Sequence, residues 1–317
     1  MPDSRAHRTL SKPLSSDPAF SLAWLIHPAP TQQFFASYWE TQTLVVKRNQ
    51  PHYYDSLLTL DAVDRALTTL DRKYPEVVLK NANLPVSEND YTLKDGSLDV
   101  ARVYQLFQEG STITLAFLDT VLPELNSFCR SLERELSFPM QANIYLTPPA
   151  GQGAKPHYDT HDVFVLQVSG SKQWTIYETP VELPLASQDF DSAIHPIGAS
   201  TLEFELEAGD MAYIPRGAAH DARSTDMTSL HVTAGVLRYT WADLILEAVA
   251  GAALTDPAFR RSLPPGFART DFDRSQAFEM FRELLRRVPA QANFDAALDR
   301  FVDEFIAACP PQLRGQM

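Results

Sequence analysis

The chain has 317 residues, of which 44% are hydrophobic and 21% charged, a composition typical of a folded protein with a sizeable core. At about 150 residues per domain, this length predicts one large domain or two smaller ones. The net charge of −13 argues against general binding to nucleic acid or to anionic membranes. The two cysteines, Cys129 and Cys309, form no CxxC pair, which excludes a disulfide framework and a cysteine-rich zinc site.

The N-terminal part predicts an arm followed by a cover. Residues 1–30 show little apolar periodicity and predict a flexible arm. They are polar and rich in proline and serine, without the apolar stretch of a signal peptide, so we expect a cytoplasmic protein. Residues 31–139 predict an α/β cover that packs on the following domain. A helical start and a short strand follow Phe34, and Asp61 is the expected N-cap of a helix.

The rest of the cover alternates between loops and helices. Residues 74–100 are loop-rich, and a helix is predicted over residues 100–108. The run 111–118 is compatible with a strand or with the lead into a helix, and the sequence leaves both open. Apolar residues recur every three or four positions from Leu122 to Leu136, which predicts an amphipathic helix packed on something larger.

The pattern changes at Met140. Six short β runs occur from there to Leu237, separated by glycine, proline, asparagine, aspartate and serine. Such runs predict a sandwich or small barrel over residues 140–240, and they argue against a βαβ sheet. Apolar spacing of three and four returns in residues 241–317 and predicts a C-terminal helical bundle. The predicted fold class is therefore mainly β with helices at both ends.

One motif has the spacing of a metal site. His157 and Asp159 are two residues apart next to a β run, and residues i and i+2 of a strand face the same side. His220, at the end of a strand and a Pro/Gly turn, is placed to supply a third ligand. Two histidines and one carboxylate form the facial triad that binds non-haem Fe(II) with open positions. A helical His157/His161 pair lacks the HExxH glutamate, and Pro156 argues against a helix there.

Several dispersed motifs together resemble a known family. The blocks NIYLTPPAGQGAKPHYDTHDVFVLQVSGSKQWTIYE, GDMAYIPRGAAHDA and SLHVTAGV resemble the JmjC-type cupin Fe(II)/2-oxoglutarate oxygenases, closest to the ribosomal oxygenase (cupin-4) branch. The resemblance covers residues 140–240 and extends more loosely upstream through FFASYWETQTLVVKR. It implies a double-stranded β-helix (jelly-roll) core. It also implies Fe(II) bound by His157, Asp159 and His220, and 2-oxoglutarate as co-substrate.

The same resemblance implies a pocket for 2-oxoglutarate. Lys172 would pair with its far carboxylate, Asn143 and Tyr145 would help to hold it, and His231 would line the pocket. Without the resemblance, a lysine beside a turn is more often exposed to solvent. The polar face of Asn143 and Tyr145 is then equally well a solvated outer face, and a lone strand histidine is more often structural.

Other residues near these motifs are expected to have no chemical role. Trp174 and Phe164 are expected to pack the barrel, and Arg216 is expected to act through position. Asp221 directly follows His220 and is expected to point away from the metal site.

The activity that the resemblance implies is hydroxylation of an amino-acid side chain of a protein or peptide, using O₂. The substrate would be a ribosomal protein or a natural-product precursor peptide. A JmjC-type methyl-lysine demethylase is the alternative reaction, and a non-catalytic metal-binding cupin scaffold or sensor is the alternative of another class. The resemblance also implies a homodimer formed through residues 241–317, and no nucleic acid or membrane partner is expected.

Overall fold

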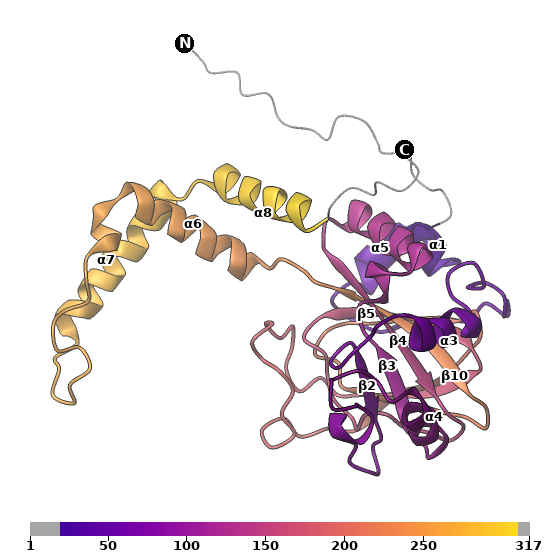
Figure 1. Ribbon diagram of the computed structural model, residues 1–317. Helices are drawn as coiled ribbons and strands as arrows, with labels where there is room; N and C mark the ends of the chain where they lie inside the picture. The colour runs from indigo at the N-terminus through magenta and orange to yellow at the C-terminus, as the bar shows by residue number, and fades with distance from the viewer. Residues whose placement is uncertain (1–19, 310–317) are drawn as a thin grey trace, which may run out of the picture. The chain divides into compact units, whose positions relative to one another are not determined.

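The computed structural model describes residues 20–309, and the chain divides into two compact units after Leu237. The barrel unit, up to Leu237, contains all of the strands, and the helical unit begins at Arg238 (Figure 1). In the described part of the chain, no helix combines the length and the apolar character needed to cross a bilayer.

The barrel unit is built on two antiparallel sheets. The larger has the strand order β1-β8-β5-β10-β4-β3-β2, and the smaller has the order β7-β6-β9. Strands β5 to β10 are divided between the two sheets, with β5, β8 and β10 in the larger and β6, β7 and β9 in the smaller, as in jelly rolls. The strands are β1 (Leu44–Val46), β2 (Val77–Lys80), β3 (Thr112–Leu115), β4 (Met140–Thr147), β5 (Asp162–Ser169), β6 (Ser171–Tyr177), β7 (Ser200–Glu207), β8 (Met211–Ile214), β9 (His220–Ser224) and β10 (Ser229–Val236).

Helices precede the barrel strands and follow them. The α-helices are α1 (Leu22–Ile26), α2 (Thr31–Ser37), α3 (Leu60–Thr69), α4 (Val100–Gln108), α5 (Pro123–Leu136), α6 (Trp241–Thr255), α7 (Ser275–Gln291) and α8 (Phe294–Ala308). Short 3₁₀ turns are η1 (Glu88–Asp90), η2 (Leu118–Thr120) and η3 (Pro257–Arg260). The mainly β class with helices at both ends, predicted from the sequence, is thereby confirmed.

The larger sheet is apolar on both faces, which explains why β5 is an almost unbroken hydrophobic run. Phe164 and Leu166 belong to the core beneath the N-terminal helices, as expected for Phe164. Their neighbours Val163 and Val165 point to the opposite face, where they pack with Trp174 and other side chains of the smaller sheet. The second face therefore forms the interior of the barrel.

Two expectations need correction, and one open case is decided. Residues 20–30 do not form an arm: Ser21 caps α1, and Leu22 and Leu25 are fully buried, while residues 1–19 lie outside the described residues. The N-cap of α3 is Thr59, because its hydroxyl accepts the hydrogen bond from the Ala62 N–H. The loop-rich stretch before α4 contains β2, and the open case of residues 111–118 resolves as a strand, β3.

Candidate metal centre

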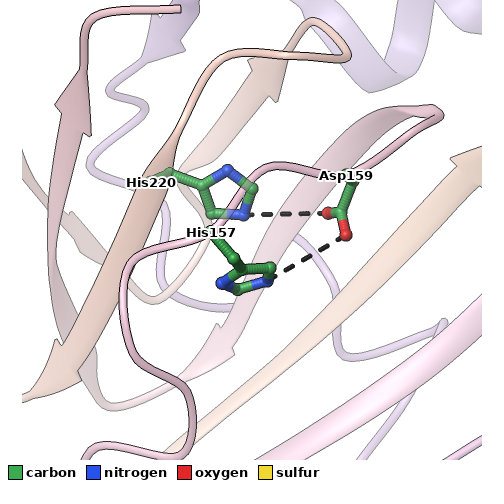
Figure 2. A group of neighbouring side chains, drawn as sticks. All are labelled: His157, Asp159 and His220. Atoms are coloured by element: carbon green, nitrogen blue, oxygen red, sulfur yellow. Dashed lines mark ion pairs between the residues drawn. The ribbon is translucent and has the colours of Figure 1, made fainter. Parts of the chain in front are cut away.

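His157, Asp159 and His220 meet at one point on the inner side of the barrel. His157 precedes β5 and His220 begins β9, and their backbones form an antiparallel bridge with N···O distances of 3.1 and 2.7 Å. The ligating atoms of the three side chains lie within 4.8 Å of one another. Figure 2 shows both imidazoles turned toward the carboxylate of Asp159, with Nε2–O distances of 4.0 Å for His157 and 3.7 Å for His220.

The second ring nitrogen of each histidine contacts a backbone carbonyl. His157 Nδ1 lies 2.8 Å from the Lys155 oxygen, and His220 Nδ1 lies 3.0 Å from the Ala218 oxygen. A carbonyl can only accept, so each Nδ1 carries the proton and each Nε2 keeps its lone pair. Both lone pairs are therefore free to bind a cation in front of Asp159.

The ionisation of these groups suits cation binding. Burial lowers the pKa of His220, and the charge of His157 lowers it further, so its imidazole stays neutral. Burial alone would raise the pKa of Asp159, but His220, His161 and His157 outweigh it and hold that pKa below its ordinary value. Near neutral pH the cluster thus offers a carboxylate beside a neutral imidazole.

A cavity of about 110 Å³ opens beside the cluster, between the two sheets. The sequence-predicted residues Lys172, Tyr145 and His231 line it together with His157, Asp159 and His220. Asn143 is not among its lining residues, but it lies two positions from Tyr145 on β4, and its Oδ1 accepts hydrogen bonds from Gln141 Nε2 at 3.1 Å and from the Phe117 N–H at 3.4 Å. The structure therefore brings six of the seven predicted residues to the cavity, and the seventh, Asn143, lies next to Tyr145 along the same face of β4.

Lys172 is a buried cation that lacks an acidic partner. Its side chain on β6 is 4% exposed, and no carboxylate of residues 20–309 lies within ion-pair distance of it. Its nearest polar neighbour is His231 Nδ1 at 3.3 Å. Burial lowers the pKa of Lys172 to about 7. Burial, and then the charge of Lys172, lower the pKa of His231, so this imidazole is neutral and accepts the hydrogen bond.

Tyr145 and His231 form one wall of the cavity. They are paired across β4 and β10, and their rings stack with centroids 4.7 Å apart and planes 2° from parallel. Burial raises the pKa of the Tyr145 hydroxyl, so it remains a hydrogen-bond donor at neutral pH. The wall thus presents a phenol next to the ammonium of Lys172.

Sequence reasoning missed other lining residues. Thr112 and Thr114 on β3 face the cavity, and their alternation in Thr112–Leu115 was the available signal, which the undecided assignment of this run concealed. Trp174, expected only to pack, also lines the cavity, and its buried Nε1 has no hydrogen-bond partner among the described residues. Lys80, at the end of β2, also lines the cavity.

Two further residues near the motifs, Arg216 and Asp221, were expected to have no chemical role. Arg216 pairs with the fully buried Asp162 at 3.0 Å and also with Glu40, so its position at the barrel end is structural, as expected. Asp221 points away from the metal site, as expected, because it pairs with Thr175, whereas His220 pairs with Ile176 in the barrel interior. Its carboxylate accepts a hydrogen bond from Gln152 at 2.9 Å, although the residue is also among those that line the cavity.

Residues 119–244 match the family model of the JmjC domain. The chain is 32% identical over 300 residues to the bifunctional lysine-specific demethylase and histidyl-hydroxylase NO66 of Aedes aegypti, covering 89% of this chain and 47% of that protein. It is 30% identical over 318 residues to ribosomal oxygenase 1 of Danio rerio, covering 92% of this chain and 56% of that protein. The chain therefore spans about half the length of the curated relatives it matches.

A solved structure of Escherichia coli YcfD, described as a ribosomal oxygenase in complex with cobalt and 2-oxoglutarate, matches with a TM-score of 0.54 and 17% identity. The match covers 88% of this chain and 71% of that chain. A second YcfD structure, with cobalt and succinic acid, gives a TM-score of 0.55 at 18% identity. At identities this low, the similarity to these structures shows a shared fold alone. The family model thus identifies a JmjC domain in residues 119–244, the two-sheet barrel agrees with the cupin fold, and the chain is similar to curated ribosomal oxygenases.

Proposed function

We propose that the chain is an Fe(II)- and 2-oxoglutarate-dependent dioxygenase that hydroxylates an amino-acid side chain of a protein or peptide. The observation that carries the proposal is one cavity in which two imidazole Nε2 atoms and a carboxylate converge beside a buried lysine without an acidic partner. The two imidazoles and the carboxylate suit a metal ion, and the buried lysine suits an anion bound next to that ion.

His157, Asp159 and His220 would hold the iron. Two imidazoles and one carboxylate on one side of the ion leave other coordination positions open, which an oxygenase requires and a closed structural zinc site does not. The Lys155 and Ala218 carbonyls support this assignment, because they orient each ring with Nε2 toward Asp159. When bound, iron and 2-oxoglutarate supply the oxidation of a C–H bond, with succinate and carbon dioxide as the other products.

Lys172 would bind the carboxylate of 2-oxoglutarate that is remote from the metal. A buried ammonium without a counter-charge is unfavourable, and an incoming carboxylate removes that penalty. The Tyr145 hydroxyl and the Trp174 Nε1 are donors on the same walls and would complete the hydrogen bonds. Asn143 would support this wall from its place beside Tyr145 on β4, and His231 would accept a hydrogen bond from Lys172 and so aim the ammonium into the cavity.

A protein side chain is the proposed substrate, since the curated relatives are named as a histidyl-hydroxylase and a ribosomal oxygenase. Histidine hydroxylation is the reaction we favour. The net charge of −13 suits a basic protein and disfavours nucleic acid as a partner. Because the NO66 relatives are also named as lysine-specific demethylases, removal of a lysine methyl group is the second candidate reaction.

The proposal is tested by anaerobic loading with Fe(II) and 2-oxoglutarate, followed by oxygen and a mixture of histidine-containing and methyl-lysine peptides. We expect succinate release coupled to the gain of one oxygen atom in a histidine peptide. Loss of a methyl group would instead identify a demethylase. His157→Ala is the control and should release no succinate. Metal binding without succinate release in any mixture would show a non-catalytic scaffold and refute the proposal.

A homodimer formed through the helical unit is part of the proposal. Of the hydrophobic side chains in residues 238–309, only Ala252 and Ala297 are buried. Large apolar side chains are exposed on all three helices, among them Trp241, Phe281 and Ile306. Monomeric proteins rarely leave such surfaces uncovered, so a second copy of the chain is the proposed partner.

We propose a cytoplasmic location for the protein. Cys129 and Cys309 are not joined by a disulfide bond, as is usual for proteins of a reducing compartment.

A further inference from the structure

Tyr158 stands between two of the three residues of the metal cluster. Because neighbouring residues of an extended chain point in opposite directions, its side chain leaves on the side opposite His157 and Asp159. It does not reach solvent there, since only 2% of the residue is exposed. Another element of the structure must therefore cover it.

The covering element is the β6–β7 connection, residues 178–199. The Tyr158 hydroxyl donates a hydrogen bond to the Gln188 carbonyl at 2.9 Å, with the Asp189 carbonyl at 3.4 Å. The ring of Phe190 meets the Tyr158 ring edge to face at 5.3 Å, and the His195 ring does the same at 5.4 Å. The connection thus surrounds the phenol with two rings and two carbonyl groups.

The same connection also contacts the segment that leads to His220. Gly217 has φ of +83°, and a Cβ atom at this position would lie 2.1 Å from the Val181 carbonyl oxygen, so only glycine permits this close approach. The Gly217 N–H in turn donates a hydrogen bond to the Asp159 carbonyl at 3.0 Å. One connection therefore supports both chain segments that carry the cluster.

We propose that Tyr158 is a positioning residue, which anchors the His157–Asp159 segment in the β6–β7 connection and thereby sets the distance between the cluster's ligating atoms. The proposal rests on the proposed metal site. Residues behind a ligand typically change metal affinity by about 10- to 100-fold when altered. Because Tyr158 acts through the backbone, we expect a change at the lower end of this range.

The test compares Co(II) binding by the full-length chain, followed by calorimetry and by the visible absorption of Co(II). Tyr158→Phe keeps the ring and removes the hydrogen bond to Gln188. Tyr53→Phe is the matched control, because the Tyr53 hydroxyl also donates to a backbone carbonyl, that of Trp24 at 2.7 Å, away from the cluster. Phe190→Leu weakens the contact between the Tyr158 and Phe190 rings by a change in the β6–β7 connection, and it leaves the His157–Asp159 segment unchanged.

We expect Tyr158→Phe to weaken Co(II) binding about 10-fold and to alter the Co(II) spectrum, while Tyr53→Phe leaves both unchanged. Phe190→Leu should weaken binding in the same direction. Equal Co(II) affinity in the parent, Tyr158→Phe and Phe190→Leu would overturn the role of Tyr158 and leave the metal site standing. An equal loss in Tyr158→Phe and Tyr53→Phe would also overturn it, since the effect would then be global. If the parent chain binds no Co(II), the metal site fails, and this inference with it.

Discussion

Replacing Lys172 by methionine should stabilise the protein and at the same time remove its affinity for 2-oxoglutarate. Burial lowers the pKa of this lysine from its ordinary 10.5 to about 7. At about 1.4 kcal/mol per unit, the folded state at pH 7 carries a penalty of about 4 kcal/mol that the methionine variant avoids. For a protein of this size, the melting temperature without ligand should rise by roughly 6 °C.

The pH dependence of this difference has a definite sign. A lowered pKa in the folded state means that the penalty is complete below about pH 7, shrinks as the pH rises, and vanishes above pH 10.5. The stability advantage of Lys172→Met over the parent should therefore shrink over the same interval. Denaturation curves at several pH values measure it. Lys80→Met is the control, because this exposed lysine of the same cavity should change stability by less than about 0.5 kcal/mol.

Added 2-oxoglutarate should reduce the stability advantage of Lys172→Met over the parent to less than half. At about 100 times its dissociation constant, it stabilises the parent by about 2.7 kcal/mol and leaves Lys172→Met unchanged. A methionine variant that is less stable than the parent at pH 7 without ligand would refute the reasoning, because the lysine would then have a counter-charge.

Two further predictions concern the same cavity and the helical unit. The affinity for 2-oxoglutarate should fall about 20-fold between pH 6.5 and 8.5, because free Lys172 loses its proton and binding must restore it. Calorimetry in buffers of different ionisation heat should show the proton uptake, and a pH-independent affinity would contradict the role of Lys172. Phe281→Glu, on an exposed apolar face of α7, should convert the proposed dimer into a monomer in light scattering, and an intact dimer would exclude this face from the interface.

Two of the three residues of the metal cluster could be predicted from a local signal, whereas His220 is remote in the sequence and was supported by the family resemblance. His157 and Asp159 are two positions apart, and a strand-like segment brings both to one side. Six of the seven strands from β4 to β10 were also predictable, since their apolar residues alternate or run together. The exception, β9, reads His-Asp-Ala-Arg-Ser and has no such pattern. It is a strand because β6 and the His157 bridge supply its partners, which the sequence of β9 does not contain.

Other features could not be predicted from the sequence because they depend on contacts between segments that lie far apart in the chain. Thr112 and Thr114 belong to the cavity only once β3 is known to pair with β4. Tyr158 reads as a spacer between two ligands, and its partner Gln188 lies 30 positions away. Helix α1 was overlooked for a different reason, since one buried turn capped by Ser21 is too short to establish a period.

The different environments of the two thiols have a practical consequence. Cys129 is completely buried in α5, and burial raises the pKa of its thiol well above the ordinary value, so alkylating reagents meet almost no thiolate there. Cys309 follows α8 and is partly exposed. A maleimide spin label would therefore attach to Cys309 alone, without any engineered cysteine. Each chain would then carry a single reporter, and two reporters within one particle would give an interspin distance by pulsed paramagnetic resonance.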